Sequence, residues 1–181
     1  MMNPISTIDK GVYEKKRDEV LQAAIAFDAG DAKRIQHLIK VYTYAALIGR
    51  GEQLPEATQQ MLELAAILHD IGIHAAEEKY GSPAGIYQEK EGPAPARELL
   101  HKVSGIPEEM VERIAYLIGH HHTYKNVDGA DYQILLEADF LVNAYEDNLS
   151  EKALLSFREK VFRTQSGTKL LNTIYGLNLP R

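Results

Sequence analysis

The chain has 181 residues, 45% of them hydrophobic, which is enough for one domain with a substantial core. Its formal net charge is −6, with acidic and basic residues interspersed, which argues against a protein that grips long nucleic acid through many phosphates. No apolar run is long enough to span a bilayer, and the absence of cysteine excludes disulfides and thiolate metal sites.

The first two predicted elements are helices joined by a short turn. Apolar residues at helical spacing predict a helix from residue 12 to about residue 27. Asp31 is a suitable cap for a second helix, which runs from residue 32 to about residue 48. The stretch Gly49-Arg50-Gly51 then predicts the end of that helix, because glycine disfavours a helix interior.

A third helix and a long irregular segment follow. Pro55 favours the first turn of a helix that reaches Asp70 or Ile71, where Gly72 stops it. Residues 79 to 95 are rich in glycine, proline and serine, which predicts a loop. An irregular stretch of this length between core helices is typical of a lid or a pocket rim.

The second half of the chain also reads as helix. We expect one helix over about residues 94 to 103 and another from Pro107 to the histidine cluster near residue 120. After a loop at residues 126 to 131, a strongly apolar helix covers about residues 132 to 146, and the tail holds one or two more. Because no alternating run suggests a strand, the sequence predicts one all-α helical bundle over residues 1 to 181.

Three ligand-type residues lie on the predicted second and third helices. His37 shares the apolar stripe of its helix and therefore points toward the core, either as a hydrogen-bonded core residue or as a metal ligand. His69 and Asp70 stand side by side at the buried end of the third helix. An ionised aspartate there needs a cation or several donors, unless Asp70 is exposed and His69 simply packs in the core.

The remaining candidates are downstream. His120-His121-His122 cannot all face one centre, since successive helical side chains diverge by about 100°. We expect His121 to be the first of the three to point inward and one of its neighbours to be the next candidate. At least one of the three is expected to be solvated. Asp139 lies within a very apolar helix, so a basic side chain or a metal must match its charge, whereas Glu137 is expected to be exposed.

Together these residues would form a mixed nitrogen and oxygen site. Imidazole and carboxylate donors suit a divalent ion such as Fe, Mn, Zn, Ni, Co or Mg. A site with an open position can lower the pKa of a bound water from about 15.7 toward about 7, which produces hydroxide at neutral pH. The sequence therefore favours a mixed-donor metal site with positions left for water or substrate.

This arrangement resembles the HD-domain superfamily of metal-dependent phosphohydrolases. The matching elements are His37, the step His69-Asp70-Ile71-Gly72, the cluster His120-His121-His122, and Asp139, and they span about residues 30 to 145. The resemblance implies an all-helical fold of the HD-domain type and hydrolysis of a phosphoester. It also implies a divalent metal held by His37, His69, Asp70 and Asp139.

Roles for individual residues follow by analogy with that family. Asp70 would bind the metal and orient the attacking water, while Arg34 and Lys79 would bind phosphate. His120 and His121 are candidates for a second metal or for a phosphate contact. Where binuclear members carry a further histidine, this chain has Gln88, and that difference favours a single metal.

The sequence thus predicts a metal-dependent phosphohydrolase that acts on a nucleotide or another small phosphoester through a metal-activated water. The alternative is a metal-containing sensor module that binds a nucleotide without efficient turnover. A related oxygenase with two irons would need more ligands than these residues supply. We expect a cytoplasmic protein with a small phosphorylated substrate, no long nucleic acid and no membrane partner, and apolar terminal helices would suit a homodimer.

Overall fold

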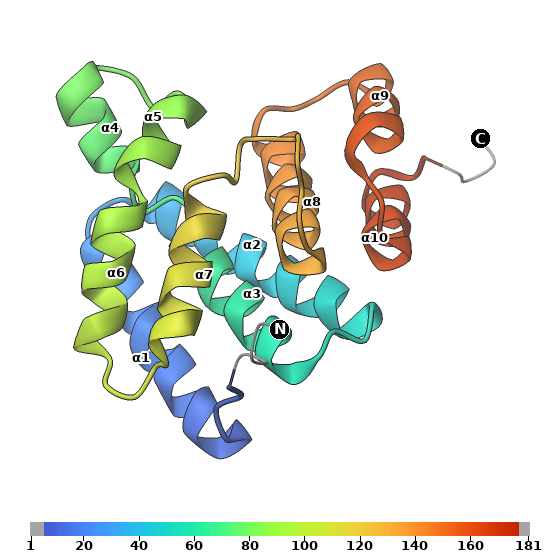
Figure 1. The fold of residues 1–181 in the computed structure, drawn as a ribbon. Coiled ribbons are helices and arrows are strands. Elements are labelled where there is room, and N and C mark those ends of the chain that lie inside the picture. The colour runs from blue at the N-terminus through green and yellow to red at the C-terminus, as the bar shows by residue number, and fades with distance from the viewer. Residues whose placement is uncertain (1–5, 178–181) are drawn as a thin grey trace.

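The structure, a computed structural model, describes residues 6–177, which form ten helices and no strand (Figure 1). The expectation of an all-α fold is therefore confirmed. None of the helices in this range is long and apolar enough to cross a bilayer. The helices are α1 (Lys10–Phe27), α2 (Ala32–Gly51), α3 (Glu56–Leu68), α4 (Ile73–Tyr80), α5 (Gly85–Glu91), α6 (Pro93–Lys102), α7 (Glu108–Ile118), α8 (Ala130–Glu146), α9 (Glu151–Val161) and α10 (Gln165–Tyr175).

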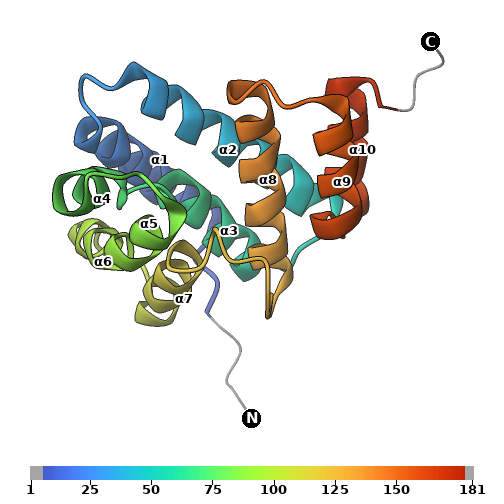
Figure 2. The ribbon, with the colours of Figure 1, turned by 90° about the horizontal axis from the view of Figure 1, so that it is seen from above.

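Helices α2, α3 and α8 pack against one another and form the centre of the bundle. Every residue of α3 from Gln59 to Leu68 is buried, because this helix is enclosed by α1, α2, α7 and α8. Figure 2 shows α4 to α7 on one side of this centre and α9 and α10 on the other. Functional side chains on α2, α3 and α8 are thus held by the most extensively packed part of the fold.

Helix α2 has the predicted cap but a later end. The Asp31 carboxylate accepts a hydrogen bond from the Arg34 backbone N–H at 3.1 Å, as expected for a capping residue. The helix runs a little past the expected residue 48 and ends at Gly51, within the Gly49-Arg50-Gly51 stretch predicted to close it. A Cβ at Gly49 would collide with the Gln59 side chain of α3, which shows that this glycine permits close helix packing.

The segment expected as an irregular loop over residues 79 to 95 is mostly helical. The end of α4, the whole of α5 and the start of α6 cover most of it, with the turn at Gly81 in the left-handed region at φ 64°. The rings of Tyr80 and Tyr87 stack with centroids 4.2 Å apart across α4 and α5. The sequence correctly indicated a turn at Gly81, but packing of side chains between α4 and α5 makes the residues on either side of this turn helical.

The tail contains two helices, α9 and α10, within the predicted number. The expectation that Glu137 is exposed is wrong, because this side chain is completely buried. Its carboxylate accepts hydrogen bonds from the backbone N–H groups of Arg163 at 2.7 Å and Thr164 at 3.0 Å. The turn before α10 returns across α8 and supplies these donors, a long-range contact that the spacing within α8 does not reveal.

Candidate metal centre

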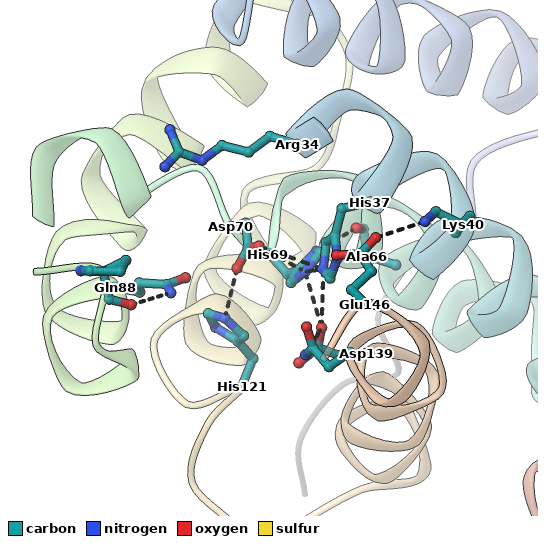
Figure 3. Close-up of polar contacts among 12 residues, drawn as sticks. Arg34, His37, Lys40, Ala66, His69, Asp70, Gln88, His121, Asp139 and Glu146 are labelled. Atoms are coloured by element: carbon teal, nitrogen blue, oxygen red, sulfur yellow. Dashed lines mark hydrogen bonds and ion pairs between the residues drawn. The ribbon is translucent and has the colours of Figure 1, made fainter. Parts of the chain in front are cut away.

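Four side chains from three parts of the fold converge on one point, as Figure 3 shows. His37 comes from α2, His69 and Asp70 follow the last residue of α3, and Asp139 comes from α8. The Nε2 atom of His37 lies 3.2 Å from Nε2 of His69 and 3.2 Å from Oδ1 of Asp139. Oδ2 of Asp70 lies 3.6 Å from His37 Nε2 and 3.5 Å from His69 Nε2.

The end of α3 explains how two consecutive residues share this point. The α-helix ends at Leu68, and the backbone continues in tighter turns, with Ile71 N–H donating to the Leu68 carbonyl and Ile73 N–H to the Asp70 carbonyl. Asp70 is therefore released from the helical repeat, which would otherwise separate its direction from that of His69 by about 100°.

The hydrogen bonds made by the Nδ1 atoms of His37 and His69 fix the orientation in which their Nε2 atoms face the centre. Nδ1 of His69 donates to the Ala66 carbonyl at 2.8 Å, and Nδ1 of His37 donates to the Glu146 carboxylate at 3.0 Å. In the neutral rings both Nε2 atoms are then acceptors, so they cannot hydrogen bond to each other at 3.2 Å without an added proton or cation. Two nitrogens on one metal at about 2.0–2.1 Å lie about 3.0–3.4 Å apart, so the arrangement fits a divalent ion.

The protonation of the cluster reflects the same need for positive charge. Burial lowers the pKa of His37, but its hydrogen bond to Asp139 and the charge of Asp70 outweigh that effect and raise it to about 9. Burial raises the pKa of Asp139, yet the hydrogen bonds with His37 and His69 hold it well below its usual range. The acidic side chains are therefore ionised at neutral pH and need a proton or a metal between them.

A second group of ligand-type atoms shares Asp70. Its members are Asp70, His121 and His122, while the first group is His37, His69 and Asp70. Nδ1 of His121 donates to the Ile118 carbonyl at 2.7 Å, which leaves its Nε2 as an acceptor only 3.3 Å from Oδ1 of Asp70. The buried Nε2 atoms of His121 and His122 have no hydrogen-bond partner in residues 6–177.

The histidine cluster differs from expectation in one position. His121 is completely buried and faces Asp70, but its neighbour in the centre is His122, which the sequence did not single out. His120 turns away, donates from Nδ1 to the Tyr116 carbonyl at 2.7 Å, and packs against the Tyr116 ring. Helix α7 ends at Ile118, so the three histidines follow a turn whose path the helical repeat does not predict.

The two predicted phosphate-binding cations are both engaged by acids. Arg34 lines the cavity beside the centre, but its guanidinium lies 2.7 Å from the Glu77 carboxylate and 3.2 Å from that of Asp31. Lys79 pairs with Glu91 and is not among the residues that line the cavity. In Figure 3 the Arg34 side chain extends away from the four converging ligands.

A cavity of about 460 Å³ opens over the metal centre. Lys33 lines it and makes no ion pair with any residue from 6 to 177. Gln88 and Asn143 contribute carboxamides, and Asn143 donates from Nδ2 to Oδ1 of Asp139 at 2.8 Å. The full lining comprises Asp31, Lys33, Arg34, His37, Asp70, Ile73, Glu77, Pro83, Gln88, His122, Asp139, Asn143, Glu146 and Asp147.

Comparison with known proteins agrees with this geometry. The HD domain family matches residues 34–156, a span that contains every candidate ligand described above. A predicted HD superfamily hydrolase from an uncultured Thermotogales bacterium, known from its crystal structure, has a similar fold with a TM-score of 0.61 and 23% sequence identity. The similarity covers 90% of this chain and 84% of that one, whereas no curated protein matches. The chain belongs to the HD-domain family.

Proposed function

We propose that this protein is a metal-dependent phosphohydrolase that acts on a nucleotide or another small phosphoester. The observation that carries the proposal is the pair of imidazole acceptors of His37 and His69, which face each other beside two ionised carboxylates at the floor of a cavity. Membership of the HD-domain family supports the same chemistry. The resident cofactor is a divalent ion, for which Fe, Mn, Zn, Ni, Co and Mg are the candidates.

Each ligand has a role that its surroundings support. His37, His69, Asp70 and Asp139 hold the ion, and Asn143 fixes the Asp139 carboxylate by donating to it. When bound, a divalent ion supplies Lewis-acid activation of water and neutralises charge on the phosphate.

Asp70 has the central position in this scheme. Its Oδ2 faces the imidazoles of His37 and His69, and its Oδ1 faces that of His121. The carboxylate can therefore accept a hydrogen bond from the attacking water while it remains a ligand, which orients that water toward phosphorus. On its other side, His121 and His122 form a place for a second cation or for a phosphate oxygen.

The charge of the phosphate requires a cation on the cavity wall. We assign this role first to Lys33, which is exposed to the cavity and has no acidic partner within the described part of the chain. Arg34 is the second cation of the wall, and it reaches a phosphate only by exchanging its contact with Glu77. Lys79 can contribute only by leaving Glu91.

The proposal is tested by elemental analysis, followed by a phosphoester screen with the identified metal. We expect stoichiometric bound metal and released phosphate, with both reduced in His69→Ala. The matched control is His101→Ala, which removes an exposed imidazole on α6 and should change neither measurement. A protein that binds no divalent ion, or a His69→Ala variant with full activity, would overturn the proposal.

A second candidate function is a sensor module that binds a nucleotide without efficient turnover. It is favoured by the ion pairs that occupy both Arg34 and Lys79, since an effective phosphohydrolase needs cations directed at the phosphate. Equilibrium binding measured beside product analysis separates the two functions. Tight binding with no released phosphate supports the sensor, and released phosphate supports the enzyme.

A further inference from the structure

The residues that line the cavity over the candidate metal centre indicate which alcohol the phosphate of the substrate is attached to. We propose that it selects the phosphomonoester of a small, hydroxyl-rich alcohol, such as a sugar or polyol phosphate, over a nucleotide. This inference rests on the proposed function, and it goes further by naming the class of alcohol.

The cavity wall lacks the groups that usually hold a nucleobase. Of the residues that line it within the described chain, Ile73 and Pro83 are the apolar ones, and none is Phe, Tyr or Trp. Bases are typically held by stacking on flat aromatic side chains or between apolar ones. The two imidazoles of the wall, His37 and His122, belong to the two groups of candidate metal ligands.

The wall instead presents oxygen atoms that could accept hydrogen bonds and to which no described residue donates. Gln88 is 6% exposed and donates from Nε2 to the Pro83 carbonyl at 2.7 Å, which fixes the orientation of its carboxamide. The reversed orientation would place two acceptor oxygens against each other. The Oε1 atom of Gln88 is consequently buried with no partner in residues 6–177, on a side chain that extends from α5 toward the cavity (Figure 3). A buried acceptor that no described residue satisfies can take a donor from a ligand hydroxyl or from an ordered water that such a hydroxyl displaces.

Two further acceptors of the cavity wall come from α8 and from the residue that caps its C-terminus. Asn143 donates to Asp139, so its carboxamide orientation is also fixed, and its Oδ1 accepts no hydrogen bond from any described residue. The Asp147 carboxylate, at the end of the same helix, has neither an ion pair nor a side-chain hydrogen bond there. Hydroxyl groups are the natural complement, because each can donate to one of these oxygens.

The balance of charge limits the ligand to about one phosphate. Six carboxylates line the cavity against two basic side chains, Lys33 and Arg34, and Arg34 is already paired with Glu77. A phosphomonoester carries a charge of about −1.5 to −2 at neutral pH. Asp70 and Asp139 already offset a divalent ion, so Lys33 is the wall cation left to offset a phosphate, and a triphosphate would add further negative groups beside the carboxylates of the wall. The carboxylates are Asp31, Asp70, Glu77, Asp139, Glu146 and Asp147.

The test compares kcat/KM for glycerol 3-phosphate and hexose 6-phosphates with kcat/KM for nucleoside 5′-monophosphates and triphosphates. It uses the full-length protein loaded with its identified metal, and phenyl phosphate serves as a substrate without hydroxyl groups. We expect at least one hydroxyl-rich phosphate to exceed every nucleotide by about tenfold or more. A nucleotide that equals or exceeds all of them overturns the inference.

Two variants test the assigned acceptors. Asp147→Ala and Gln88→Leu should each lower the preference for the best hydroxyl-rich phosphate over phenyl phosphate by about tenfold. Glu98→Ala, which removes an exposed carboxylate on α6, should leave that preference unchanged. Because Asp147 is exposed at a helix end, its variant keeps the test valid even if Gln88→Leu fails to fold. An unchanged preference in Asp147→Ala contradicts the assignment.

Failure of the proposed function remains distinguishable from failure of this inference. If no phosphoester is hydrolysed, phenyl phosphate included, the phosphohydrolase proposal is overturned. Equilibrium dialysis of the metal-loaded protein with the same hydroxyl-rich phosphates and nucleotides then decides the selectivity. Tighter binding of the hydroxyl-rich phosphates supports the inference, and tighter or equal binding of nucleotides overturns it.

Discussion

Glu146 is predicted to set the metal affinity although it is not one of the four ligands. Its Oε2 accepts the hydrogen bond from Nδ1 of His37 at 3.0 Å, and its Oε1 accepts one from Lys40 at 2.7 Å. Burial raises the pKa of Glu146, but the contacts with Lys40 and His37 outweigh that effect and lower it overall. An ionised carboxylate therefore holds the imidazole in the tautomer and orientation that present Nε2 to the metal.

Removal of such an outer contact typically weakens metal binding about 10- to 100-fold, or about 1.4–2.7 kcal/mol. Glu146→Gln keeps an acceptor for His37 but loses the charge, so we expect a loss near tenfold. Glu146→Ala loses both and should approach 100-fold. The matched control is Asp147→Ala, which removes a carboxylate from the same helix end without contact to His37, and it should stay within about twofold.

The measurement is competition for the metal with a chelating dye at fixed pH and ionic strength. Graded losses in Glu146→Gln and Glu146→Ala, with little change in Asp147→Ala, support the reasoning. If Glu146→Ala bound the metal as tightly as Asp147→Ala, Glu146 could not be orienting a ligand, and the place of His37 in the metal centre would be refuted.

Three further predictions concern protons, stoichiometry and packing. In the metal-free protein the pKa of His37 is raised to about 9, so this side chain is protonated at pH 7. Binding of a metal at His37 should therefore displace about one proton. The affinity for the metal should rise as the pH increases toward 9. Calorimetry in buffers of different ionisation enthalpy measures that proton, and its absence contradicts the prediction. If a second cation binds, His122→Ala should lower its occupancy and His120→Ala should not, as elemental analysis would show; equal effects would contradict the geometry. A Cβ at Gly72 would lie 2.8 Å from the Cα atom of Gly92, so Gly72→Ala should cost about 1–3 kcal/mol in thermal unfolding, while an unchanged melting temperature would argue against this contact.

Sequence reasoning singled out the candidate ligands whose positions depend on local pattern. His37 and Asp139 lie on the buried faces of regular helices, where the 3.6-residue repeat alone indicates direction. The choice of His122 over His120 depends on the turn after α7, where that repeat no longer applies. Glu146 was missed because its role depends on the crossing of α2 and α8, and an acid at a helix end is usually solvated.

The fold shows the same division between local and distant causes. The all-α class and the capping of α2 by Asp31 follow from residues close together in the sequence. The burial of Glu137 and the order of the segment around Tyr87 depend on contacts with other helices. These contacts are settled only when the whole bundle is packed, so a single sequence gives little indication of them.

The close approach of Gly72 and Gly92 connects the cavity wall that contains Gln88 with the backbone that positions Asp70. Gly72 stands two residues after Asp70, and its backbone rests against the junction of α5 and α6. The hairpin of α4 and α5, which carries Gln88, is therefore anchored at its base, while its tip at residues 81 to 84 reaches solvent. Substitutions at that tip can change the wall of the cavity and leave the largely buried cluster of His37, His69, Asp70 and Asp139 undisturbed.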